Sequence, residues 1–163
     1  MIKTLLWIVF FCLVIISQSF AVENIAPALN LDGDGIALQG YDPVSYHNLS
    51  PEKGRKDLSV EYAGAVYLFT NPDNQKTFNN SPETYLPAFG GWCAWAMLDG
   101  EHVNVDPETF KIINGRAYLF YNSFFTNTLT KWNTLAVKET EQILADKAQS
   151  EWETLQPIPN STQ

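Results

Sequence analysis

One short motif occurs twice in this chain, and each copy has the pattern of a β-hairpin that leads into a helix. Gly-Ala-Val-Tyr-Leu-Phe-Thr-Asn at 64–71 matches Gly-Arg-Ala-Tyr-Leu-Phe-Tyr-Asn at 115–122 in five of eight positions. A β-prone stretch precedes each copy, with Ala-Gly or Asn-Gly at the turn, and Asn-Gly is a strong hairpin signal. Asn71 and Asn122 fall near the expected helix starts. Two copies are too few for a solenoid, so the motif predicts two hairpin-then-helix units.

The helices predicted around these hairpins are short, except near the end of the chain. Asp42 and Pro43 have the pattern of an N-cap followed by the first helical residue. Between Trp132 and Leu155, apolar residues recur at near-helical spacing with charged residues elsewhere, which predicts one long amphipathic helix. The expected fold class is therefore α+β: a small antiparallel sheet built from two β-hairpins, packed by short helices and one long C-terminal helix.

Both ends of the chain are predicted to lie outside this domain. Lys3, an apolar run and the small residues Ser19 and Ala21 have the pattern of a secretory signal peptide over residues 1–21. The protein is thus expected to be exported, to the periplasm in the first instance, with secretion from the cell as the alternative. The remaining predicted segments are a flexible leader at 22–36, one domain at 37–155 and a disordered tail at 156–163.

Charge and hydropathy argue against two classes of partner, nucleic acids and membranes. The chain has 10 Lys and Arg against 18 Asp and Glu, a net charge of −8. Nucleic acid and anionic membranes attract basic surfaces, so neither is an expected partner. No apolar segment follows the signal region that could span a bilayer, so no stable membrane insertion is expected after the signal is cleaved.

Several motifs together resemble a known family. In chain order they are Gly-Tyr-Asp-Pro-Val-Ser-Tyr at 40–46, Glu-Tyr-Ala-Gly-Ala-Val-Tyr-Leu-Phe at 61–69, Phe78, Pro82, Tyr-Leu-Pro at 85–87 and Gly-Gly-Trp-Cys-Ala at 90–94. Their order and spacing resemble the YHS domain family, and more closely its exported, single-domain bacterial members. The resemblance covers roughly residues 37 to 135 and implies a shared fold and strand pairing.

The same resemblance has an implication for metal binding. The better-understood YHS proteins are small metal-handling modules attached to heavy-metal pumps. In them a cysteine follows Asp-Pro-Val, and the Tyr-Phe strand ends in Cys-x-x-x-Cys. These ligand positions fall here on Ser45, Thr70 and Asn74, none of which is a thiol. The resemblance therefore implies that this chain has lost the metal site of the family.

Cys93 offers a different candidate site. It is the only cysteine after the signal region, and a helix over this stretch would place it on one face with Met97. Thiolate, thioether and imidazole ligands suit Cu(I), and His47 and His102 are the two histidines of the chain. One hypothesis is therefore an exported, non-enzymatic protein that handles a soft transition metal, copper first, through these four residues.

Two other hypotheses remain open. Buried Cys and Met are ordinary core residues, and the protein would then be a binding module for a small ligand or a protein partner. The candidate binding surface is a face of aromatic side chains. If other parts of the chain cover this face, it belongs to the hydrophobic core; if it is open, it forms an apolar groove for a ligand. Its members are Tyr67, Tyr85, Trp92 and Trp95. The third hypothesis, a cysteine-dependent enzyme, is disfavoured because neither histidine lies in a catalytic signature and nearby indoles raise the pKa of a thiol.

Overall fold

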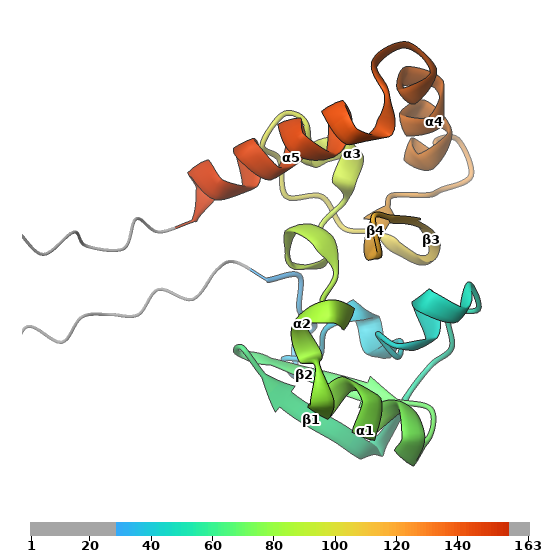
Figure 1. Ribbon diagram of the computed structural model, residues 1–163, viewed down its shortest axis with the longest axis vertical. Coiled ribbons are helices and arrows are strands. Elements are labelled where there is room, and N and C mark those ends of the chain that lie inside the picture. Colours follow the sequence, from blue (N-terminus) through green and yellow to red (C-terminus); the bar gives the residue numbers. More distant parts are fainter. Residues whose placement is uncertain (1–28, 157–163) are drawn as a thin grey trace, which may run out of the picture.

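Both predicted hairpins are present, and each forms a two-stranded antiparallel sheet of its own (Figure 1). The computed structural model describes residues 29–156, so the predicted signal peptide at 1–21 and residues 157–163 of the predicted tail lie outside the described residues. The strands are β1 (Arg55–Tyr62), β2 (Ala65–Phe69), β3 (Asp106–Ile113) and β4 (Arg116–Phe120). The α+β class is confirmed, and the single sheet expected from the two hairpins is instead two separate sheets.

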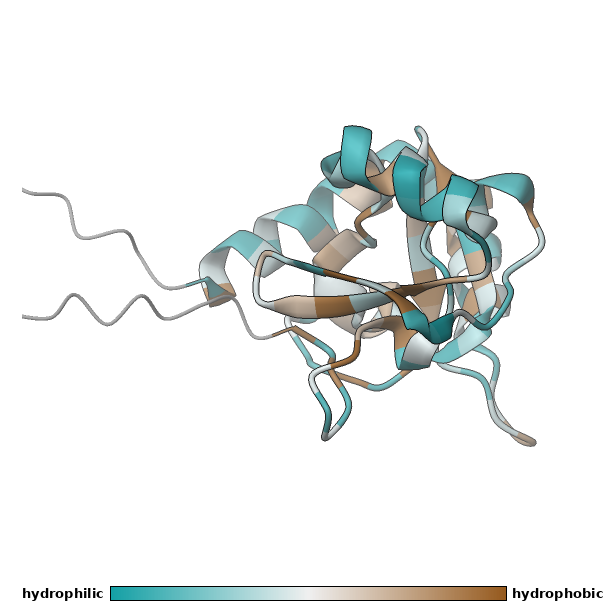
Figure 2. Ribbon diagram, turned by 90° about the horizontal axis from the view of Figure 1, so that it is seen from below, coloured by the Kyte–Doolittle hydropathy of each residue, from teal (hydrophilic) through white to brown (hydrophobic). Residues whose placement is uncertain are grey.

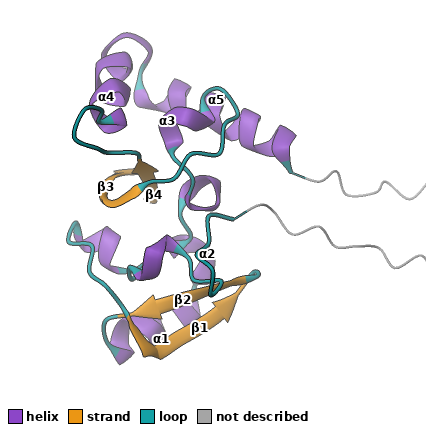
Figure 3. Ribbon diagram, turned by 180° about the vertical axis from the view of Figure 1, so that it is seen from behind, coloured by secondary structure: helices purple, strands orange, loops and turns teal. Residues whose placement is uncertain are grey.

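Short helices surround the hairpins. The α-helices are α1 (Pro72–Asn80), α2 (Pro82–Tyr85), α3 (Ala94–Met97), α4 (Thr128–Glu139) and α5 (Glu141–Leu155), and the 3₁₀ helices are η1 (Leu38–Gly40), η2 (Ser45–Asn48) and η3 (Ala88–Gly91). The first hairpin lies beside α1, and the second lies near α3 and α4 (Figures 1 and 3). None of the helices within residues 29–156 has the length and apolar character needed to cross a bilayer.

The two hairpins have the same register. Tyr62 pairs with Ala65 at the end of the first hairpin, and Ile113 pairs with Arg116 at the end of the second, so the offset is 51 residues. All the other pairs keep this offset, and both hairpins contain an irregularity after their first pair. Both turn residues have positive φ in each hairpin, as a type I′ turn requires. The repeat seen in the sequence is thus a repeat of backbone geometry.

The same offset holds upstream of the hairpins, where the sequences differ. Residues 38–40 have φ values of 55°, 52° and 83°, and residues 89–91 have φ values of 53°, 59° and 88°. Three consecutive residues with positive φ are rare, because only glycine adopts this region at little cost. Their occurrence at equivalent places shows that the repeated unit includes η1 in the first copy and η3 in the second.

Equivalent hydrogen bonds follow each of these turns. The backbone N–H of Asp42 donates to the carbonyl of Glu52 (2.9 Å), and the N–H of Cys93 donates to the carbonyl of Val103 (3.0 Å). Donors and acceptors are again 51 residues apart. Asp42 and Cys93 therefore occupy the same place in the two repeated units.

The units differ after the hairpin. In the first, Asn71 caps α1 directly, since its side chain accepts a hydrogen bond from the N–H of Asn74 (2.8 Å). In the second, the helix expected near Asn122 begins at Thr128, and the capping side chain is that of Asn127. The extra loop between β4 and α4 carries Phe124 and Phe125, which are 93% and 91% exposed.

The helix predicted over 132–155 is divided in two. Thr140 has a φ of 67°, which ends α4, and its side chain accepts a hydrogen bond from the N–H of Ile143 (3.4 Å) as the N-cap of α5. The apolar spacing continues across this break because Trp132 on α4 and Leu144 on α5 are buried in the same cluster. The long C-terminal helix is therefore α5, with 15 residues.

The predicted flexible leader at 22–36 is described from Leu29, and this part is packed against the domain. The N–H and the side-chain amide of Asn30 donate to the carbonyls of Gly90 and Gly91, both at 3.0 Å. Ile36 forms a parallel β-bridge with Val66. Residues 29–36 thus belong to the fold rather than to a leader.

The buried apolar residues form two clusters, and β4 contributes to both. Ala117 and Leu119 pack in the cluster around the first hairpin, whereas Tyr118 and Phe120 pack in the cluster with α4 and α5. Because side chains alternate along a strand, the two faces of β4 are buried in different clusters. Figure 2 shows the apolar residues concentrated on the inner segments and the outer turns of the helices largely hydrophilic.

Candidate functional site

The three positions onto which the YHS resemblance carries metal ligands lie around a buried carboxylate, that of Asp42, which is 0% exposed. Its Oδ2 accepts hydrogen bonds from the N–H (3.0 Å) and hydroxyl (2.9 Å) of Thr70 and from the amide of Asn74 (2.7 Å). The Ser45 hydroxyl donates to the carbonyl of Asp42 (2.6 Å). Thr70 and Asn74 therefore bind the carboxylate of Asp42, and Ser45 binds its backbone carbonyl.

Cys93 makes the equivalent contact in the second unit. Its sulfur is fully buried and accepts a hydrogen bond from the N–H of Tyr121 (3.3 Å), just as Asp42 accepts one from the N–H of Thr70. The hydroxyl of Thr128 lies 3.5 Å from the same sulfur. In both units, the side chain after the positive-φ turn satisfies a backbone donor at the end of the hairpin. This gives Cys93 a structural role.

Cys93 and Met97 are one helical turn apart, because the N–H of Met97 donates to the carbonyl of Cys93 (3.0 Å). Cys93 lies before α3 as its N-cap residue, with extended backbone, and Met97 is the last residue of that helix. Cys93 packs in the cluster of the first hairpin and Met97 in the cluster of α4 and α5.

The two histidines lie in separate aromatic surroundings. The ring of His47 is 4.9 Å from that of Tyr85, and the ring of His102 is 4.9 Å from that of Trp92. Burial lowers the pKa of His47, which favours its neutral form. Within residues 29–156, no three His, Cys, Asp or Glu side chains are grouped so that they could hold a metal ion. The four residues of the metal hypothesis therefore do not form one site.

The four predicted aromatic residues do not share one open face either. Tyr85 and Trp92 pack against the two histidines as described above. Tyr67 is buried, with its ring 5.1 Å from that of Phe78, and Trp95 is half-buried. Tyr67 and Trp95 line two different pockets.

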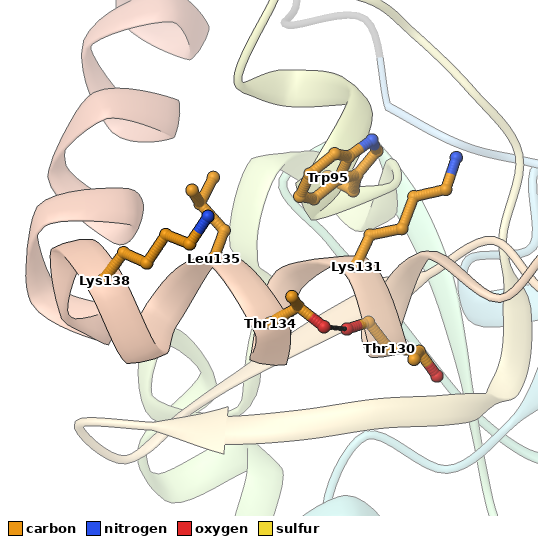
Figure 4. A pocket seen from close by; sticks show the side chains of 6 residues that line it. All are labelled: Trp95, Thr130, Lys131, Thr134, Leu135 and Lys138. Atoms are coloured by element: carbon orange, nitrogen blue, oxygen red, sulfur yellow. Dashed lines mark hydrogen bonds between the residues drawn. The ribbon is translucent and has the colours of Figure 1, made fainter.

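The pocket at Trp95 is a shallow depression of about 330 Å³ between α3 and α4 (Figure 4). Trp95 and Leu135 supply its apolar surface, and two exposed lysines of α4 lie beside them, as the close view shows. The Nζ atom of Lys131 is 6.0 Å from the centre of a Trp95 ring, at the outer limit of a cation–π contact. The other lining residues are Thr130, Thr134 and Lys138.

The pocket at Tyr67 is smaller, about 170 Å³, and more enclosed. It lies where the two units meet, because its walls come from the first hairpin, the segment after α2, η3, β4 and α5. The residues that supply most of this wall are Leu29, Tyr67, Leu86, Pro87, Arg116 and Trp152. We refer to it below as the Arg116 pocket.

Gly90 keeps the wall of the Arg116 pocket closely packed. Its φ is +59°, and a Cβ atom there would lie 2.9 Å from Cδ2 of Leu29 and 3.1 Å from the ring of Trp152. Both distances are shorter than ordinary carbon–carbon contacts. Glycine therefore allows the N-terminal segment and α5 to approach η3 at this point.

Arg116 is the one charged residue that lines this pocket. The guanidinium donates to the carbonyl of Pro87 (3.3 Å) and pairs with no carboxylate within residues 29–156. Burial lowers the pKa of Arg116, and the neighbouring Tyr118 partly opposes this effect. Burial also raises the pKa of Tyr67, to about 12, so this phenol is neutral at pH 7. An arginine stays charged in proteins, so the pocket presents a cation and a phenol among apolar walls.

Comparisons with protein families, with curated proteins and with solved structures found no match to this chain. The YHS resemblance therefore stays a prediction. Sequence reasoning identified Tyr67 but missed Arg116 and Trp152. The available signal was the repeat itself, because Arg116 stands where the first copy has Ala65, a buried residue.

The Asp42 network predicts a specific loss of stability. Asp42→Asn replaces a carboxylate oxygen, which accepts three hydrogen bonds, by an amide group that can itself donate. We therefore expect a loss of about 3 kcal/mol in the free energy of unfolding. The matched control is Asp106→Asn, because Asp106 is half-buried and also accepts from a hydroxyl, that of Thr109 (2.7 Å). Its expected loss is about 1 kcal/mol. Urea denaturation measures both, and equal losses would contradict the anchoring role of Asp42.

The burial of Cys93 predicts its reactivity. We expect iodoacetamide to leave the folded protein unmodified at neutral pH and to alkylate Cys93 once urea unfolds the chain, because the sulfur is fully buried. Mass spectrometry at increasing urea concentrations measures this. Rapid modification without urea would instead support the hypothesis of an activated, catalytic cysteine.

Proposed function

We propose that this protein is an exported, non-enzymatic binding module that holds a small, largely apolar ligand in the Arg116 pocket. The observation that carries this proposal is the pocket itself, a partly enclosed space between the two repeated units with aromatic and aliphatic walls. Such pockets with a few polar groups are the usual form of small-molecule sites. Export rests on the signal pattern of residues 1–21.

The volume of the pocket limits the size of the ligand. A cavity of about 150 Å³ lined by apolar side chains is known to admit benzene. The Arg116 pocket, at about 170 Å³, therefore suits a body of about one six-membered ring or a short branched aliphatic chain. Larger ligands would have to extend through its mouth, where Ala63 is exposed.

Binding without catalysis is supported by the residues that line the pocket. They include no His, Cys, Asp or Glu, the side chains that most often act as nucleophile or general base. Cys93 is engaged in the core contact with Tyr121. The negative net charge of the chain gives no support to a nucleic-acid partner.

The geometry favours this proposal over the two alternatives raised by the sequence. The residues of the soft-metal hypothesis are dispersed, as described above. The depression at Trp95 is shallower and its lysines are exposed, so a ligand there would keep much of its surface in water and gain less from burial. The Arg116 pocket is therefore the preferred site.

A pocket-filling substitution tests the proposal. Benzyl alcohol and benzoate serve as neutral and anionic single-ring probes, and nuclear magnetic resonance titration of the full chain measures their dissociation constants. We expect at least one probe to bind, and Leu86→Trp to weaken that binding about tenfold or more, because the larger side chain occupies the pocket.

The matched control is Leu135→Trp, which fills the depression at Trp95 instead. We expect this variant to bind the probes as the unmodified chain does. The proposal is wrong if neither probe binds to the unmodified chain, or if Leu135→Trp reduces binding while Leu86→Trp does not.

A further inference from the structure

We infer that the Arg116 pocket selects a small monocarboxylate with an apolar body, and that Arg116 is the residue that recognises the carboxylate. This inference rests on the proposed function and specifies its ligand class. It is carried by the position of Arg116, by its hydrogen-bond partners and by the residue at the equivalent place in the first unit.

The first observation is that Arg116 lacks a carboxylate partner in an acidic protein. Within residues 29–156, three other cations pair with carboxylates: Arg55 with Asp57, Lys56 with Asp34 and Lys111 with Glu141. The Arg55 and Lys56 pairs lie on exposed parts of the surface, where water already solvates the charges, and the Lys111 pair is half-buried. Arg116 is half-buried, where a charge gains more from a partner, yet its hydrogen bond goes to a neutral carbonyl.

The second observation is that the repeated unit does not need a cation at this place. Arg116 is equivalent to Ala65, which pairs with Tyr62 in the same register as Arg116 pairs with Ile113. The first hairpin therefore forms the same geometry with a methyl side chain. Because the hairpin does not require arginine, its presence is better explained by the pocket that it lines.

The third observation is the chemistry of the donors. A guanidinium has five N–H donors in a planar fork, and the Pro87 carbonyl occupies one of the two terminal nitrogens, Nη2. The remaining donors match a carboxylate, which accepts two parallel hydrogen bonds from such a fork. Tyr67 lines the same pocket, and its neutral phenol offers a second donor there.

The fourth observation fixes the rest of the ligand. Leu29, Leu86 and Trp152 line the pocket together with a single charged residue, Arg116. A ligand with one carboxylate and an apolar ring or branched chain would satisfy both parts. A dianion would leave its second charge against apolar walls, at a large desolvation cost, so the pocket discriminates against it.

The test compares two probes of nearly the same shape, benzoate and benzyl alcohol, on the full chain by isothermal titration calorimetry and nuclear magnetic resonance. We expect benzoate to bind about ten- to a hundredfold more tightly, since hydrogen bonds between charged groups are worth that much. Arg116→Met should remove this difference in affinity. We expect it to weaken the binding of benzoate by the same factor and to change the affinity for benzyl alcohol by less than about twofold.

Two further variants make the result specific. Arg116→Lys keeps the charge and loses the planar fork, so we expect it to recover part of the benzoate affinity. Lys131→Met and Lys138→Met together remove the lysines beside Trp95, and we expect benzoate affinity to be unchanged. Arg116→Ala reproduces the residue of the first unit, and urea denaturation of this variant shows that the fold survives the loss of arginine.

The outcomes separate the two proposals. If both probes bind equally to the unmodified chain, or if Arg116→Met leaves benzoate affinity unchanged, carboxylate selection is wrong and the pocket remains a binding site. If the lysine substitutions abolish benzoate binding and Arg116→Met does not, the anion binds at Trp95 and the inference is wrong. If neither probe binds, the proposed function fails together with it.

Discussion

The backbone N–H that follows the second strand of each hairpin is the donor on which both units depend. At the end of a two-stranded sheet this donor has no further strand to pair with, and burial without an acceptor would cost free energy comparable to a lost hydrogen bond. The carboxylate of Asp42 accepts it from Thr70, and the sulfur of Cys93 accepts it from Tyr121. Because each acceptor lies well upstream of the hairpin, the bond ties the positive-φ turn to the far end of the sheet.

The two acceptors explain why the units look so different in sequence. A buried carboxylate is stable only when several donors satisfy it, which accounts for the hydroxyl of Thr70 and the amide of Asn74 around Asp42. A thiol is nearly apolar and needs little further solvation, so Cys93 sits among aromatic side chains with only the Thr128 hydroxyl nearby. The isolated cysteine that suggested a metal site is, in this structure, the counterpart of the buried Asp42 in the second unit. Asp42 is not the N-cap that the sequence predicted, because the short helix begins at Ser45 with Val44 as its N-cap.

The sequence predicted the parts of the fold that rest on local signals. Matching turn residues and strand patterns identified both hairpins, and the fold class followed from them. The sequence did not reveal the upstream half of the repeat, because Asp42 and Cys93 occupy equivalent positions but have chemically different side chains. In addition, residues 38 and 39 have positive φ although neither is glycine. The break at Thr140 was hidden by apolar spacing that continues across it. Arg116 escaped notice because a charge in a strand usually indicates a solvent-facing position.

The pocket arises where the repeat stops being symmetric. Both faces of β4 are buried, one in each apolar cluster, so this strand holds the two units together and cannot present an open face. Its first residue, Arg116, lies at the edge of that contact, where Gly90 lets Leu29 and Trp152 close around it. In the first unit the same edge ends in a small, buried alanine. One edge residue of a repeated unit can thus change while the hairpin is kept, because the hairpin geometry is already fixed by the turn and by the upstream acceptor. In the second unit the changed residue is Arg116, which lines the pocket.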